Sequence, residues 1–171
     1  ADVGLVAEGG AGCCLCPTTE RDLADGIGPS RRMSEAGIPI SLGSDSHATI
    51  DLLEEARAVE MNQRVVTLER GVHAPESLFS VATTNGSRAL HWEGGMLESG
   101  ASADFTTISL DSARVAGTEP ANALASVVFG ANAGDIDHVV VAGRTVVADG
   151  AHSSIDVPAA LDKAVRTLMA A

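Results

Sequence analysis

The clearest indication of the fold is the stretch Ile38-Pro39-Ile40-Ser41-Leu42, followed directly by Gly43-Ser44-Asp45-Ser46-His47. Its first half is a short apolar run, which predicts a buried strand, and its second half is a polar loop. The run is apolar throughout instead of alternating, which is typical of a parallel strand covered on both faces. We therefore expect residues 38–42 to form one strand of an α/β sheet, with the polar loop at its carboxyl end.

The same arrangement occurs earlier in the chain. The apolar run Ala11–Cys16 predicts another strand, and the polar segment 17–29 follows it. A helical pattern over 2–8 precedes this strand and ends in glycines, and a second helix is expected over 30–36, where Gly37 closes it. Helices that alternate with strands over short connections predict βαβ units and a parallel sheet.

The remainder of the chain has a different character. Apolar spacing predicts helices over 51–64 and from Pro75 toward Leu90. Strands are then expected over 105–110, 139–141 and 145–147, with Ala142-Gly143-Arg144 as a hairpin turn and a closing amphipathic helix over 155–169. The first half of the chain thus has the pattern of consecutive α/β units, and the last third that of a small β-rich module.

The composition excludes several classes of partner. The formal net charge is −12 and the pI about 4.6, which argues against nucleic acid or an anionic membrane, since both select for Lys and Arg. No apolar run approaches the ~20 residues needed to span a bilayer. Aromatic residues make up only 2% of the chain, so the core must be aliphatic. The chain begins with Ala1 and not with Met, so we expect a processed or partial product.

Three cysteines, Cys13, Cys14 and Cys16, lie within four positions. Their number and spacing do not suit a disulfide scaffold. Because they fall in an apolar run, we expect them to be buried as small hydrophobic residues. A redox or zinc role for the Cys13–Cys16 pair stays open. Either role fits a reducing compartment, and we expect a cytoplasmic protein.

Asp45 is the main candidate for chemistry. In a parallel α/β sheet or barrel, loops at the carboxyl ends of strands bind ligands. A carboxylate placed there between Ser and Gly residues can bind a metal or accept a proton. The alternative is that Asp45 caps the following helix, since Asp is a favoured capping residue. The residues alone leave both interpretations open.

Two further side chains are weaker candidates. His47 could be a ligand, although a lone histidine is more often structural. A catalytic zinc needs about three protein ligands, and Asp45 with His47 supplies two at most. Glu20 follows the first predicted strand and could contact an amidine or amine of a substrate, or be a solvated loop charge.

Several segments together resemble one family. They are residues 15–27 with Thr18-Thr19-Glu20, residues 40–47 with Gly-Ser-Asp-Ser-His, and residues 54–64. These segments are similar to formimidoylglutamate deiminases of the amidohydrolase superfamily. The stretch 139–150 is similar to the amidohydrolase superfamily in general. The resemblance covers essentially the whole chain, but the histidine metal ligands of the family have no counterpart.

The resemblance implies a fold. It predicts that residues 1–102 are the C-terminal part of a metal-dependent (β/α)8 barrel, with 11–16 and 38–42 as strands seven and eight. Residues 103–171 would be the C-terminal share of a small β-sandwich domain with a closing helix. A full barrel takes ~250 residues, so the first part of the enzyme, with the remaining metal ligands, must lie outside this chain.

The resemblance also implies a reaction. The complete enzyme would hydrolyse N-formimino-L-glutamate to N-formyl-L-glutamate and ammonia, with one divalent metal, zinc, and as a homodimer. Asp45 would bind the metal and act in catalysis, and Glu20, Ser46 and His47 would bind substrate. This chain alone would be inactive. Two alternatives remain open: a guanine- or adenosine-type deaminase, against which Thr18-Thr19-Glu20 argues, and a non-catalytic barrel fragment that serves as a binding module.

Overall fold

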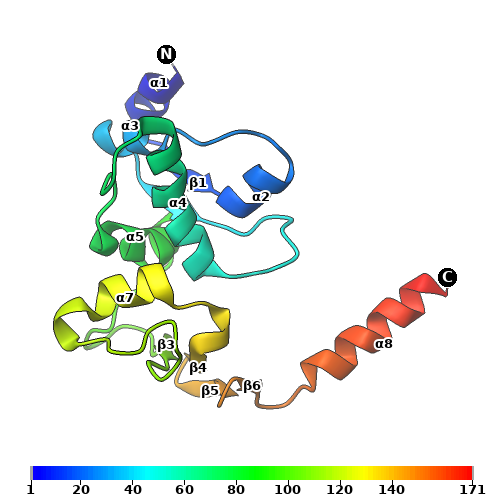
Figure 1. The fold of residues 1–171 in the computed structure, drawn as a ribbon. Helices are drawn as coiled ribbons and strands as arrows, with labels where there is room; N and C mark the ends of the chain where they lie inside the picture. Colours follow the sequence, from blue (N-terminus) through cyan, green and yellow to red (C-terminus); the bar gives the residue numbers. More distant parts are fainter. Residues whose placement is uncertain (1, 171) are drawn as a thin grey trace.

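The computed structural model describes residues 2–170, and it contains two separate sheets with helices around the first (Figure 1). In chain order the elements are α1 (Asp2–Glu8), β1 (Cys13–Leu15), α2 (Pro17–Asp22), α3 (Ser30–Glu35), β2 (Ile40–Leu42), α4 (Leu52–Thr67), α5 (Pro75–Ala82), α6 (Thr84–Ala89), β3 (Phe105–Ile108), the 3-10 turn Pro120–Asn122, α7 (Ala123–Gly130), the 3-10 turn Ala133–Asp135, β4 (Ile136–Val141), β5 (Arg144–Ala148), β6 (Ala151–His152) and α8 (Val157–Met169).

The first sheet consists of β1 and β2, which pair in parallel with Cys13 opposite Ile40 and Leu15 opposite Leu42. Both strands fall inside the predicted runs and are shorter than predicted. Within residues 2–170, each of the two strands has the other as its only partner. Because the strands are parallel, their carboxyl ends meet at one edge, which is where the polar loops begin.

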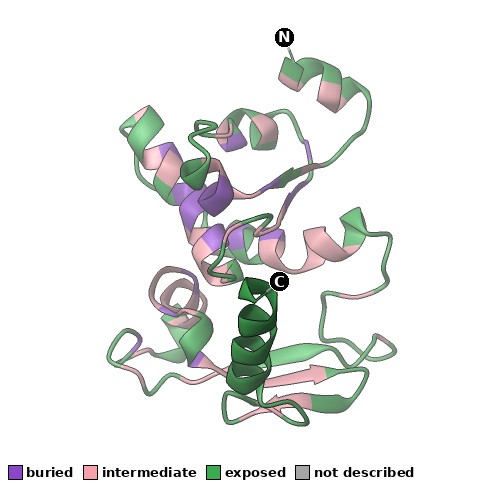
Figure 2. Cartoon of the chain, turned by 90° about the vertical axis from the view of Figure 1, so that its right-hand side faces the viewer, coloured by how far each residue is buried: buried purple, intermediate pink, exposed green. Residues whose placement is uncertain are grey.

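The core lies between this sheet and helices α4, α5 and α7 (Figure 2). Its buried members are Leu15, Ile40, Ala56, Val59, Leu78, Val81 and Val128. Asp51 begins α4, because its side chain accepts hydrogen bonds from the backbone N–H groups of Leu53 and Glu54. The core is aliphatic, as the composition predicts.

Two predictions about helices were wrong. The polar segment 17–29 contains α2, with Pro17 in its first turn, where a missing N–H has no cost. The helix predicted from Pro75 toward Leu90 is broken at Thr83, whose φ of −128° and ψ of −91° are not helical. The second part, α6, is held by a tertiary contact, because the Asn85 side chain donates to the carbonyl of Ile40 at 2.9 Å.

The second sheet is antiparallel, with the order β3-β4-β5-β6. Two-residue turns join its last three strands, at Ala142-Gly143 and Asp149-Gly150. All four turn residues have positive φ, as hairpin turns with the right-handed twist of the strands require. The division of the chain at residue 103 stays a prediction, and α7, which follows it, packs against α4 and α5.

Helix α8 extends away from the rest of the molecule (Figure 1). Asp156 caps it by accepting from the N–H of Ala159, as expected for the predicted closing helix. Its apolar side chains are exposed: Val157, Leu161, Val165, Leu168 and Met169. No helix in residues 2–170 combines the length and apolar character that a membrane crossing needs.

Asp135 ties the start of β4 to the loop before α7, and this predicts an acid-sensitive contact. Its buried carboxylate accepts from the Arg114 guanidinium at 3.1 and 2.6 Å, and from the N–H of Asn132 at 2.9 Å. The bonds from Arg114 outweigh burial and hold the pKa of Asp135 at about 2, against an ordinary 3.8.

A lowered folded-state pKa stabilises the fold above about pH 4, and this contribution is lost as the pH falls toward 2. Because Arg114 is half-exposed, solvent screens the pair, and we expect a contribution on the order of 1–2 kcal/mol. Urea unfolding at about pH 5 and about pH 2.5 measures it. Asp135→Asn should flatten the pH dependence between these values. An equally steep dependence in the variant would assign it to other groups.

Candidate active site

Asp45 lies in a tight turn at the carboxyl end of β2. Its backbone is left-handed, with φ of 46°, and its side chain is exposed. The turn is tied to β1 by the N–H of Gly43, which donates to the carbonyl of Leu15 at 3.0 Å, and it is closed by the N–H of His47, which donates to the carbonyl of Ser44 at 3.1 Å. The alternative that Asp45 caps the next helix is wrong, because Asp51 has that role. Asp45 is left with its carboxylate facing outward at the sheet edge.

Glu20 lies in α2 and not in a loop. Its Oε1 accepts from the N–H of Cys16 at 3.0 Å, so the side chain reaches back to the first residue before the helix. The interpretation of Glu20 as a solvated loop charge is therefore wrong. The contact leaves Oε2 for other partners, and substrate binding by Glu20 stays a prediction.

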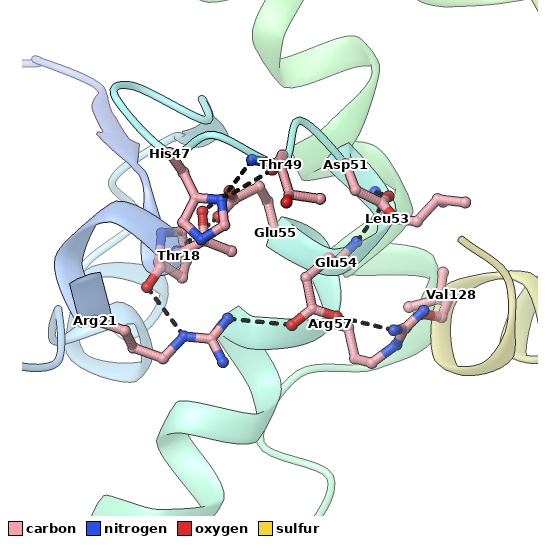
Figure 3. A network of polar contacts seen from close by, with 11 residues as sticks. Thr18, Arg21, His47, Thr49, Asp51, Leu53, Glu54, Glu55, Arg57 and Val128 are labelled. Atoms are coloured by element: carbon pink, nitrogen blue, oxygen red, sulfur yellow. Dashed lines mark hydrogen bonds and ion pairs between the residues drawn. The ribbon is translucent and has the colours of Figure 1, made fainter. Parts of the chain in front are cut away.

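Ser46 and His47 follow Asp45 in the same turn, as predicted. Ser46 is exposed, and His47 is half-buried. Nδ1 of His47 lies 3.1 Å from the N–H nitrogen of Thr49, from which it can accept a hydrogen bond. This bond orients the imidazole along the loop between β2 and α4 (Figure 3). A substrate-binding role for either residue stays a prediction.

Cys14 and Cys16 border the turn, whereas Cys13 packs against the core. Cys14 is exposed, and Cys13 and Cys16 are half-buried, because one face of β1 has no covering layer within residues 2–170. A Cβ atom at Gly43 would lie 3.1 Å from Sγ of Cys16 and 3.4 Å from Sγ of Cys14, so the two thiols occupy the space that a side chain at 43 would need. Burial, followed by the neighbouring Cys14, Asp45 and Glu55, raises the pKa of Cys16 to about 11. In the absence of a bound metal, the Cys16 thiol is therefore protonated at neutral pH.

Two buried polar contacts behind the turn were missed by the sequence reasoning. Glu55 on α4 is fully buried and accepts hydrogen bonds from both the N–H and the hydroxyl of Thr18 (Figure 3). Thr19, also buried, donates its hydroxyl to the carbonyl of Ser44 at 2.7 Å. A signal for Glu55 was present, because it lies four residues before Val59, on the face that the helical period assigns to the core.

The profile of the Amidohydrolase family matches residues 2–146. The chain belongs to this family. The match covers both sheets as far as β5 and includes every candidate site residue. The predicted superfamily is thereby confirmed, whereas the finer resemblance to formimidoylglutamate deiminases is not tested by this match.

Curated relatives of this amidohydrolase chain are named 5-methylthioadenosine/S-adenosylhomocysteine deaminase. The protein of that name from Pyrococcus horikoshii is 33% identical over 165 residues, which are 95% of this chain and 39% of the relative. That from Moorella thermoacetica is 29% identical over 160 residues, which are 91% of this chain and 37% of the relative. The chain thus spans less than two fifths of the length of these relatives.

Solved amidohydrolase structures share the fold. An amidohydrolase from Brucella melitensis superposes with a TM-score of 0.85 at 30% identity, over 98% of this chain and 38% of that one. An adenosine deaminase from Xanthomonas campestris with bound zinc superposes with a TM-score of 0.88 at 22% identity, over 96% of this chain and 38% of that one. These likenesses agree with the prediction of a C-terminal part of an α/β amidohydrolase.

The donors present fit one metal ligand and not a complete site. A carboxylate such as Asp45 suits a hard or borderline divalent cation. Among the residues that the structure describes, no group of three or more His, Cys, Asp or Glu side chains could hold a metal. A metal at Asp45 would need further ligands from outside this chain, as the sequence predicts.

Proposed function

We propose that this amidohydrolase chain contributes Asp45 to a complete enzyme that is a hydrolytic deaminase. The observation that carries the proposal is the position of Asp45, at the carboxyl end of a parallel strand, in a turn that leaves its carboxylate exposed. Asp45 would be both a metal ligand and the group that moves the proton. The chain alone, with one ligand, would be inactive.

The reaction adds water to an amidine carbon and releases ammonia. Water loses a proton to Asp45 as its oxygen forms a bond to the carbon of the C=N unit. Asp45 gives this proton to the nitrogen, which leaves a tetrahedral carbon that bears a hydroxyl and an amino group. Asp45 then takes the hydroxyl proton and passes it to the amino nitrogen as the C–N bond breaks, so that a carbonyl product and ammonia leave. When bound, a divalent metal, for which we propose zinc, lowers the pKa of the attacking water toward neutrality.

For the substrate we propose N-formimino-L-glutamate, because residues 15–27 and 40–47 resemble formimidoylglutamate deiminases. Glu20 follows the carboxyl end of β1 as Asp45 follows that of β2, and because the two strands are paired in parallel, both residues belong to the same sheet edge. Its free carboxylate oxygen could bind the cationic amidine, and Ser46 and His47 could bind the rest of the substrate.

An adenosine-type substrate is the second candidate, and the names of the curated relatives favour it over the first. Adenine also presents an amidine carbon that bears an amino group, so Asp45 would act in the same way. The two candidates differ in what binds the remainder of the substrate, which would lie largely outside this chain.

We further propose that the missing N-terminal part of the same enzyme pairs with this chain. Two strands cannot close a barrel, and β1 and β2, as barrel strands seven and eight, would have open edges without it. A homodimer of the complete enzyme in the cytoplasm is the remaining part of the proposal, since the three free cysteines suit a reducing compartment.

A substrate panel on the complete protein tests the proposal. We expect ammonia release from N-formimino-L-glutamate or from an adenine nucleoside, with about one zinc per protein, and loss of the activity after chelation. The intact mass under denaturing conditions shows whether the first part of the barrel is present. A stable, zinc-free monomer of this chain, inactive on every substrate, would favour the binding-module alternative instead.

A further inference from the structure

Glu55 is an ionisable side chain with no exposure, and it lies between α4 and α2. Its Oε2 accepts from the N–H of Thr18 at 3.0 Å, and its Oε1 accepts from the Thr18 hydroxyl. Two bonds to one residue fix the first turn of α2 in both position and rotation relative to α4. Burial of a carboxylate costs free energy unless hydrogen bonds such as these satisfy it. A role in addition to packing is therefore expected for Glu55.

The next residue carries this fixed position to the turn that holds Asp45. Thr19 is 3% exposed, and its hydroxyl donates to the carbonyl of Ser44 at 2.7 Å. Ser44 is bonded to Asp45, whose left-handed backbone, with φ of 46°, is rare for a residue with a side chain. A left-handed backbone of this kind persists only where surrounding contacts stabilise it. The hydrogen bond from the Thr19 hydroxyl is such a contact, because it is made to the peptide unit between Ser44 and Asp45.

We propose that Thr19 and Glu55 are positioning residues for Asp45, which together brace the metal-binding turn against helix α4. The proposal rests on the proposed role of Asp45 as a metal ligand. In the brace, α4 holds Glu55, Glu55 holds the start of α2, and Thr19 on α2 holds the carbonyl before Asp45. In this proposal both residues act through the placement of Asp45, and neither is a metal ligand or a substrate contact.

Neighbouring charges do not form a second brace of this kind. Glu54, next to Glu55 on α4, also bridges to α2, where it accepts from Arg21 at 3.1 Å, and it accepts from Arg57 at 3.0 Å (Figure 3). Its side chain is 39% exposed and that of Arg21 is 48% exposed, whereas Arg57, at 19%, also donates to the carbonyls of Val128 and Ala131. An exposed ion pair of this type contributes little, so Glu54 is a matched control for Glu55.

The test uses the complete zinc-loaded enzyme with Thr19→Val, Thr19→Ser, Glu55→Gln and the control Glu54→Gln. Zinc affinity is measured by competition with a chromophoric chelator, kcat and KM are measured separately, and hydrogen exchange is followed in the peptide that spans residues 43–47. Outer contacts that orient a metal ligand change metal affinity or activity by about 10–100-fold, and we expect effects of this size for Thr19→Val and Glu55→Gln.

The expected pattern is a zinc Kd raised about tenfold, a kcat lowered about tenfold, a KM within about twofold and faster exchange at 43–47. Thr19→Ser, which restores the hydroxyl, should return all four quantities to within about twofold of the parent, as should Glu54→Gln. If Thr19 had a purely structural role, the hydroxyl in Thr19→Ser would not be enough to restore the zinc affinity. If Glu55→Gln does not fold, the Thr19→Val and Thr19→Ser pair decides.

Zinc affinity and kcat in Thr19→Val within about twofold of the parent would overturn the brace. A parent enzyme that binds zinc but hydrolyses no substrate of the panel would rule out the proposed function. The zinc affinities of the variants would still test the brace in that case. A complete parent enzyme that binds no zinc would overturn both proposals.

Discussion

Asp45→Asn is expected to lower kcat of the complete enzyme by about a thousandfold, with the fold intact. The change removes the proton-accepting group, and general acid–base catalysis contributes about 10²–10⁴-fold. Asn keeps the size of the side chain and, among residues with a Cβ, is one of those that tolerate a left-handed backbone, so the turn at φ of 46° should survive. Ammonia release at saturating substrate measures the effect.

The zinc content of the variant separates the two roles of Asp45. A neutral amide oxygen is a weaker ligand than a carboxylate, so we expect less zinc per protein than in the parent. Asp22→Asn is a matched control, because Asp22 is exposed at the last residue of α2. It should leave both zinc content and kcat within about twofold of the parent. Full activity of Asp45→Asn would remove Asp45 from the mechanism.

Leu78→Ala is expected to give the largest loss of stability in this chain. Leu78 has no exposed surface, and it lies on α5 in the core cluster formed with α4, α7 and the first sheet. Truncation of a buried leucine removes its transfer free energy and leaves a cavity, which together cost about 3–5 kcal/mol. Urea unfolding measures the loss as a lower midpoint.

Leu90→Ala is the matched control for this prediction, because it makes the same chemical change at a side chain that is 61% exposed. A change below about 1 kcal/mol is expected there. Similar losses in the two variants would mean that the core around Leu78 is not the main source of the stability of this chain.

Local signals predicted many of the elements well. The hairpin between β4 and β5 was readable because two short valine-rich runs flank a Gly-containing turn, and α4 because its apolar spacing follows a helical period. In contrast, α2 was missed, since Pro17-Thr18-Thr19 has the composition of a loop. Burial of this first turn against Glu55 and the core makes it helical, and no local propensity indicates such burial.

For the cysteines, too, local composition mispredicted burial, but here it predicted burial where the structure shows exposure. The run Ala11–Cys16 has the composition of a strand buried on both faces, yet Cys14 is exposed. Composition predicts burial only where other elements cover a strand, and β1 has only β2 as a strand partner in residues 2–170. The prediction therefore implied a covering layer that the described residues do not provide.

Sequence patterns alone indicated the amidohydrolase superfamily, the position of Asp45 after an apolar strand, and the lack of enough donors for a complete metal site. These follow from residue types and their order along the chain, which local patterns carry directly.

Three features became visible only in the tertiary structure. Asp51 and not Asp45 caps α4, Glu20 reaches back to Cys16, and Glu55 and Thr19 lie behind the Asp45 turn. Thr18 and Glu55 are 37 positions apart, and Thr19 and Ser44 are 25. Contacts at such separations arise from the packing of α2 and α4 on the parallel strands, because that packing brings together side chains whose chemistry gives no sign of the pairing in the linear sequence.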